Sequence, residues 1–169
     1  LERKTFIKEF IKLVIGLRKI KKIHLTNRLS ILFNKLMKRK VLVFTGNRAE
    51  YGLQLPVIKS LQKSKKINCK VMVSGSHLDK KFGNTINEIK KDKLKINSKI
   101  KLTKPLNSFL HTPHLISEVI KKISKELLKI KPDVFLINAD RYETFGACVA
   151  STQMNIPTFH IEGGDKTEG

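Results

Sequence analysis

Short apolar runs alternate along this sequence with longer stretches in which apolar residues recur every three or four positions. Runs that are apolar on both faces of a strand are typical of central parallel strands. Such runs occupy residues 41–44, 70–73, 133–137 and 158–161, with a weaker one at 96–102. Because strands and helices alternate, the pattern predicts an α/β fold in which helices cover both faces of a parallel sheet.

The stretches between these runs predict four helices. They cover residues 53–63, a segment beginning near Asn84, residues 113–130 and residues 144–154. Thr112 followed by Pro113 places a capping side chain and a proline at the start of the third helix. Pro132 is expected to end that helix. Gly46 and Gly52 are expected to flank the turn from the first strand into the first helix.

Residues 1–36 differ from the rest of the chain. Their apolar positions recur at helical spacing with lysines between them, at Phe6, Phe10, Leu13 and Leu17. The segment could form a basic amphipathic helix that lies on an acidic membrane. We favour a different interpretation, because Met37 is followed by three basic residues and a strand, as at an ordinary chain start. Residues 1–36 are then an extension that the fold does not need, and residues 37–169 form the domain.

The formal net charge of +21 invites the hypothesis of nucleic-acid or anionic-membrane binding. The excess is spread along nearly the whole chain, and no zinc-finger spacing or RNA-binding aromatic motif accompanies it. We therefore interpret it as a solvated lysine surface and expect no nucleic-acid partner. A basic binding module remains the alternative from another functional class.

Two further features of the sequence bear on membrane insertion and on disulfide formation. No apolar run reaches the roughly 18 residues that a bilayer-spanning helix needs, so no stable membrane insertion is expected. Cys69 and Cys148 lie far apart within apolar segments. They are expected to be buried free thiols in a reducing cytoplasm.

Four polar segments follow four of the predicted strands. They are residues 46–52, 75–77, 140–143 and 162–165. The carboxyl ends of parallel strands open onto one edge of a sheet, where ligands bind in open α/β folds. The four segments are therefore predicted to converge on one site.

The first segment has features of an anion site. A turn at Gly46 would expose backbone N–H groups at a helix N-terminus, which attracts phosphate. Arg48 adds a guanidinium suited to an anion. A tight turn with a surface arginine explains the same residues equally well.

Asp140 and Glu162 each follow a buried strand, and two such carboxylates can divide proton abstraction and proton donation. Structural roles remain open, since Asp140 could cap the next helix and Glu162 could pair with Arg141 or Arg48. His77 and His160 carry the same ambiguity. His111 and His114 share a spacing of three but lack a third ligand nearby, so we expect no metal site.

Taken in order, the polar segments resemble those of the hydrolysing UDP-N-acetylglucosamine 2-epimerase family. The matching segments are TGNRAEYG at 45–52, GSHL at 75–78 with FGNT at 82–85, DRYE at 140–143, and HIEGG at 160–164. The resemblance covers about residues 38–169 and is specific as a set. The Arg-Ala-Glu-Tyr form at Arg48 is similar to the hydrolysing branch, whereas the non-hydrolysing branch carries Arg-Pro-Glu there.

This resemblance implies a glycosyltransferase-B type fold of two Rossmann-like halves, with the sugar nucleotide in the cleft between them. The chain would be the N-terminal half, ending before the second domain, and inactive by itself. The implied reaction is anti elimination of UDP to a 2-acetamidoglucal, followed by hydration to the 2-epimeric free sugar. No metal or redox cofactor is implied. A glycosyltransferase-like half that binds a nucleotide sugar without epimerising it is a third hypothesis.

The resemblance also implies roles for individual residues. Asp140 and Glu162 would be the acids that act at C2 and at the glycosidic oxygen, and Arg48 would meet the diphosphate of the UDP-sugar. The other implied substrate-binding positions are Gly46, Glu50, His77, Arg141 and Gly163. Ala139 stands where the family usually has glycine, and a further acidic residue of the family would lie beyond Gly169. The full-length protein is expected to be a homo-oligomer.

Overall fold

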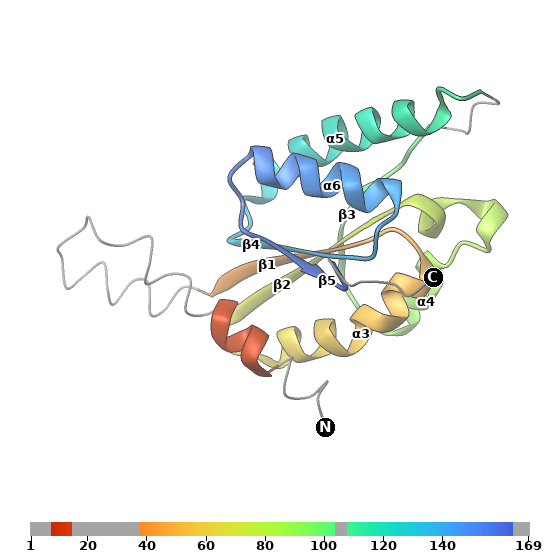
Figure 1. Cartoon of the computed structure of the whole chain (residues 1–169). Coiled ribbons are helices and arrows are strands. Elements are labelled where there is room, and N and C mark those ends of the chain that lie inside the picture. Colours follow the sequence, from red (N-terminus) through yellow and green to blue (C-terminus); the bar gives the residue numbers. More distant parts are fainter. Residues whose placement is uncertain (1–7, 15–37, 104–107, 164–169) are drawn as a thin grey trace, which may run out of the picture.

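A computed structural model describes residues 8–14, 38–103 and 108–163 of the chain. It has three layers, with a parallel sheet between two layers of helices (Figure 1). The strands run in the order β3-β2-β1-β4-β5, and every neighbouring pair is parallel. Their bounds are β1 (Arg39–Thr45), β2 (Ile67–Ser74), β3 (Ile96–Ile100), β4 (Val134–Asn138) and β5 (Thr158–Ile161). The predicted fold class is confirmed.

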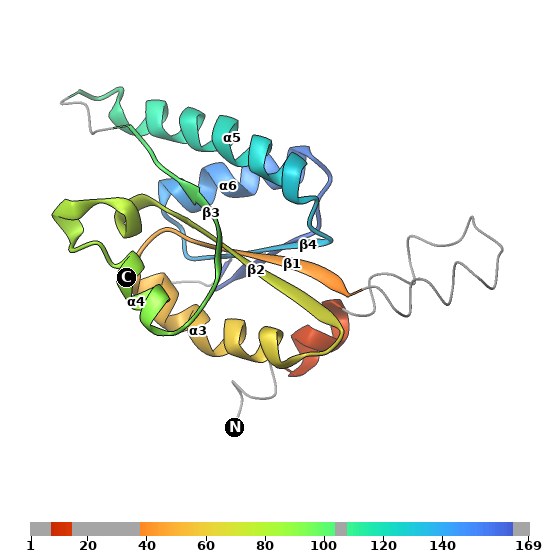
Figure 2. The ribbon, with the colours of Figure 1, turned by 180° about the vertical axis from the view of Figure 1, so that it is seen from behind.

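Helices cover both faces of the sheet, as Figures 1 and 2 show from opposite sides. The helices α3 (Arg48–Lys63) and α4 (Ile86–Lys91) lie on one face, and α5 (His111–Ile130) and α6 (Tyr142–Gln153) lie on the other. Parallel crossovers are right-handed. From β1 the chain adds β2 and β3 in one direction and then reverses to β4 and β5 on the other side of β1. The reversal places the later helices on the opposite face.

The strand β1 shows why its sequence is continuously apolar. Val41 and Val43 belong to the core on the α3 side, whereas Leu42 and Phe44 belong to the core on the α5 side. All four side chains are completely buried. Both faces of the strand are covered between Val41 and Phe44, which favours an apolar side chain at each of these positions.

The helix α3 begins at Arg48, five residues before the predicted start at residue 53. The side chain of Asn47 caps it, accepting from the backbone N–H of Glu50 at 3.0 Å. Gly52 is therefore an exposed residue inside α3, and the prediction that it flanks the turn is wrong. The cap at Asn47 outweighs the helix-breaking tendency of Gly52, so the helix begins before the glycine.

Other predicted boundaries also move. The helix α5 begins at His111 after Leu110, so Thr112 is not its N-cap, and Pro113 lies in the first turn, where no intrahelical N–H bond is required. The helix α6 starts two residues before the predicted residue 144, and α4 starts at Ile86. β3 ends at Ile100 rather than at residue 102. Cys69 and Cys148 are free but only half-buried.

Residues 8–14 form a helix, the N-terminal helix, which packs against the sheet on the α3 side. Phe10 and Val14 are 6% and 0% exposed and join that core. The ring of Phe10 meets Phe159 of β5 edge to face, with centroids 5.0 Å apart. Residues 1–7 and 15–37, where the rest of the predicted amphipathic segment falls, lie outside the described residues.

That residues 1–36 can be removed stays a prediction, and the burial of Phe10 and Val14 shows which apolar contacts their removal would break. No helix in the described part of the chain combines the length and apolar character that a membrane crossing requires.

Candidate functional site

The four predicted segments meet at the carboxyl edge of the sheet. Thr45 at the end of β1 pairs with Val73 of β2, and Asn138 at the end of β4 pairs with Ile161 of β5. The residues that follow these strand ends therefore lie along one edge, as predicted. Residues 164 and 165 of the fourth segment lie outside the described residues.

Glu50 closes the turn between β1 and α3. Its Oε2 accepts a hydrogen bond from the Gly46 N–H at 2.8 Å, and its Oε1 accepts from the Asn47 side-chain amide at 2.6 Å. Burial raises the pKa of Glu50, and the charge of Glu143 adds to this, although the bond from Gly46 lowers it. The sequence suggested that the Gly46 N–H donates to a phosphate. In the structure this N–H already donates to the carboxylate of Glu50.

Glu143 is a buried carboxylate that the sequence analysis did not single out. It lies in the first turn of α6, is 1% exposed, and accepts from Arg141 Nε at 3.2 Å. Gly75, at φ +55°, leaves room for it, since a β-carbon there would come within 2.5 Å of Glu143 Oε1. The sequence did offer one signal for Glu143, which is its place in the polar segment 140–143. Because the helix was predicted to start at residue 144, Glu143 was assigned to a loop.

His77 is completely buried in the short 3-10 helix Gly75–Leu78 that follows β2. Its ring nitrogens meet hydroxyl oxygens, with Nε2 3.0 Å from Thr45 Oγ1 and Nδ1 2.8 Å from Thr85 Oγ1. Burial lowers the pKa of His77 to about 4, so the ring is neutral at neutral pH. In this arrangement His77 holds the strand end to the start of α4 and presents no atom to solvent.

Arg48 is paired with a residue of α4. Its side chain is 72% exposed, and its Nε lies 3.0 Å from Glu88 Oε1 on α4. Exposed ion pairs of this kind are worth little, typically below about 1 kcal/mol. The guanidinium can therefore leave Glu88 for an anionic ligand at small cost.

Asp140 and Glu162 are both exposed, and they follow the paired strands β4 and β5. Ala139 and Glu162 have φ of 62° and 60°, in the left-handed region that favours glycine. This backbone conformation explains why glycine suits the position that Ala139 occupies. His160 Nε2 lies 2.6 Å from the carbonyl oxygen of Ala139, so the two strand ends are joined beyond their ladder.

A cavity of about 540 Å³ opens at this edge, beside the N-terminal ends of α5 and α6. Arg141 and Glu143 line it together with Gly75 and Ser76. Its charged lining consists of Lys80, Lys101 and Arg141 against Asp79 and Glu143. A lining with more cations than carboxylates suits an anionic ligand.

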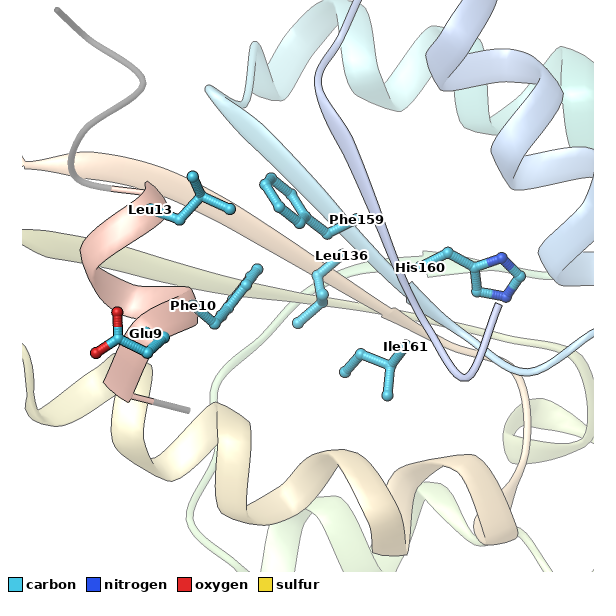
Figure 3. Close-up of a pocket in the computed structure, with 7 residues that line it drawn as sticks. All are labelled: Glu9, Phe10, Leu13, Leu136, Phe159, His160 and Ile161. Carbon is cyan, nitrogen blue, oxygen red and sulfur yellow. The ribbon is translucent and has the colours of Figure 1, made fainter. Parts of the chain in front are cut away.

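A second cavity of about 410 Å³ lies between the N-terminal helix and β5 (Figure 3). Phe10 and Leu13 of the helix face Leu136 and Phe159 of the sheet across it. This cavity is mainly apolar and lacks the converging polar groups of a reaction centre. Among the described residues, no group of three or more His, Cys, Asp or Glu side chains gathers as a metal site would require.

Comparison with known proteins places these features in a family. The sequence profile described as UDP-N-acetylglucosamine 2-epimerase matches residues 59–169. The UDP-N,N'-diacetylbacillosamine 2-epimerase (hydrolyzing) of Legionella pneumophila is 38% identical over 138 residues, which is 78% of this chain and 35% of that protein. The polysialic acid biosynthesis protein P7 of Escherichia coli is 33% identical over 129 residues, 76% of this chain and 33% of that protein.

Solved structures agree with the sequence comparison. The crystal structure of UDP-GlcNAc 2-epimerase from Neisseria meningitidis bound to UDP-GlcNAc superposes with a TM-score of 0.66 at 29% identity. The match covers 77% of this chain and 33% of that one. The chain thus spans about a third of the length of the relatives it matches. The structural match confirms the predicted resemblance to one Rossmann-like half of such a protein.

Proposed function

Because the chain belongs to the UDP-N-acetylglucosamine 2-epimerase family, we propose that it forms the N-terminal half of a hydrolysing 2-epimerase that acts on a UDP-linked 2-acetamido sugar. One observation carries the proposal. Asp140 and Glu162 are exposed carboxylates that follow the paired strands β4 and β5 at the ligand-binding edge of the sheet.

The reaction needs two carboxyl groups with different tasks. One takes the proton from C2 while the other protonates the glycosidic oxygen, so UDP leaves and a 2-acetamidoglucal forms. Water then adds across the double bond, with its oxygen at C1 and a proton at C2 on the opposite face, and the product is the free 2-epimeric sugar. Asp140 and Glu162 supply this pair, and neighbouring carboxyl groups divide such roles when their environments differ.

The remaining predicted residues have supporting parts in this proposal. Arg48 turns from Glu88 to the diphosphate, which its exposed and weakly held side chain allows. Glu50 and His77 keep the strand ends rigid through the hydrogen bonds from Gly46 and with Thr45. Arg141 directly follows Asp140, and Gly163 directly follows Glu162. A rigid backbone around these residues would position the two reacting carboxylates.

We assign the other wall of the cleft to a second domain, as the shorter length of this chain relative to its relatives suggests. A half-cleft neither excludes water nor holds the substrate in a near-attack geometry. The 169-residue chain alone should therefore release no UDP. The proposal also includes a homo-oligomeric full-length enzyme in the reducing cytoplasm, where the free Cys69 and Cys148 would stay reduced.

The test is an assay of the full-length protein with UDP-N-acetylglucosamine and with its 2,4-diacetamido-trideoxy analogue. UDP release is followed together with NMR of the sugar in D₂O. The proposal predicts UDP release and a 2-epimeric free sugar that carries deuterium at C2, because that proton comes from solvent. Release of UDP with retention of the original C2 hydrogen would reject elimination, and turnover by the 169-residue chain would reject the half-enzyme assignment.

A further inference from the structure

His160 connects the two loops that carry Asp140 and Glu162. It is a residue of β5, and Figure 3 shows its imidazole turned away from the N-terminal helix, whereas Phe159 lies toward that helix. The Nε2 atom lies 2.6 Å from the carbonyl oxygen of Ala139. A carbonyl oxygen can only accept, so Nε2 carries the hydrogen and donates it.

The other side of the same ring lies against Gly163. A β-carbon at Gly163 would collide with His160 Nδ1 and would come within 2.5 Å of Cγ and 3.0 Å of Cβ. Because the clash reaches the base of the side chain, a rotation of the ring cannot relieve it. The imidazole is thus held between the carbonyl that precedes Asp140 and the backbone that follows Glu162.

We call these contacts of His160 with Ala139 and Gly163 the His160 clamp. The clamp lies just beyond the last paired residues of β4 and β5. The register of β4 and β5 ends at the pair Asn138 and Ile161. The next residues, Ala139 and Glu162, both have positive φ, a conformation that costs an L-residue about 1–2 kcal/mol. Strained loops of this kind keep their geometry only when surrounding contacts determine it.

We propose that His160 is a positioning residue that fixes the placement of Asp140 relative to Glu162. The inference rests on the proposed function, in which these two carboxylates act on the same sugar. In this role His160 acts through the Asp140 loop and not on the sugar. Its imidazole donates to Ala139 and so ties the Asp140 loop to the strand that carries Glu162.

Two substitutions separate this role from a general structural one. In His160→Gln the side-chain amide places a donor near the position of Nε2, whereas in His160→Asn the donor lies near Nδ1 and cannot reach Ala139. In the full-length protein we expect His160→Asn to lower kcat on the order of a hundredfold with little change in KM, because a misplacement of about 1 Å costs that much. His160→Gln should stay within about threefold of the wild type. His114→Asn on the exposed face of α5 is the matched control and should leave both constants unchanged.

Equal losses in the Asn and Gln variants, or a lower melting temperature with unchanged kcat of the folded protein, would overturn the proposal. A second readout uses the 169-residue chain and does not depend on turnover. In its ¹⁵N NMR spectrum, His160→Asn should shift the amide signals of both Asp140 and Glu162, and His160→Gln should restore them. An unshifted Asp140 signal in the Asn variant would refute the coupling, even if the wild-type enzyme releases UDP. If the wild type releases no UDP but the shifts appear, the proposed function fails and the clamp stands.

Discussion

The carboxylate of Glu143 lies so close to Gly75 that a β-carbon on the glycine would come within 2.5 Å of Oε1. The same β-carbon would lie 2.7 Å from the carbonyl oxygen of Gly46. Gly46 in turn donates its N–H to Glu50. Two buried carboxylates and two glycines therefore form one tightly packed unit where β1 and β2 end, and its members are coupled in stability.

Gly75→Ala should destabilise the fold by about 2–4 kcal/mol, since it adds a left-handed alanine and a clash with a buried carboxylate. The matched control is Gly52→Ala, at an exposed position of α3 where a β-carbon meets nothing within 4 Å. That substitution should instead stabilise by about 0.5–1 kcal/mol, because alanine is the better helix former. Urea unfolding of the three proteins measures both effects, and similar values for the two variants would contradict the packing described for Gly75.

Glu50 should make stability depend on pH in a definite direction. Burial raises its folded pKa above the ordinary value of 4.5, so the folded state holds the proton more tightly than the unfolded chain. The stability that protonation provides is present at low pH and is lost as the pH rises from about 4.5 through the folded pKa. The free energy of unfolding of the wild type minus that of Glu50→Gln should therefore fall as the pH rises from about 4.5 through the raised folded pKa. A difference that rises over this range would show that the pKa is lowered.

Asp140→Asn and Glu162→Gln should each lower the turnover of the full-length enzyme by about a hundredfold to ten-thousandfold, the usual effect of losing a general acid or base. Both side chains are exposed, so folding should be intact by circular dichroism. Glu126→Gln on α5, which removes an ion pair with Lys129, is the control and should retain full activity. Near-normal turnover in both site variants would remove the catalytic assignment.

The N-terminal helix should add stability without being essential to the fold. Phe10→Ala should cost about 3 kcal/mol because the buried ring packs on Phe159, whereas Leu13→Ala, at a side chain 52% exposed, should cost about 0.5 kcal/mol. A chain that starts at Met37 should still melt cooperatively but at a lower temperature. Loss of cooperative melting in that chain would contradict the prediction that residues 1–36 are an extension.

Local sequence was sufficient to predict the sheet and the edge at which the predicted polar segments meet. The run from Val41 to Phe44 is apolar at every position, and such a pattern fits a parallel strand covered on both faces. Alternation with helices then predicts parallel pairing, and parallel pairing places the segments containing Arg48, Asp140 and Glu162 on one edge. Each step depends on residues that are close in sequence, so no distant contact has to be known.

The positions of the helix starts could not be obtained this way. Asn47 and Thr112 both favour a cap by residue type, yet Asn47 caps α3 while Thr112 lies inside α5. A capping side chain competes with alternative local hydrogen bonds. The helix α5 follows Leu110 with no side-chain cap, so residue type alone does not fix where a helix begins.

Long-range contacts decided much of the inner structure of the candidate site. Glu143 is buried because it meets Arg141 beside Gly75, a residue far from it in sequence, and His160 contacts Ala139 on a different strand end. The sequence by itself determined which polar residues gather at the carboxyl edge. Only the tertiary structure decided which of them face solvent and which hold the edge together, because the free energy of burying a charge depends on partners that the fold brings near.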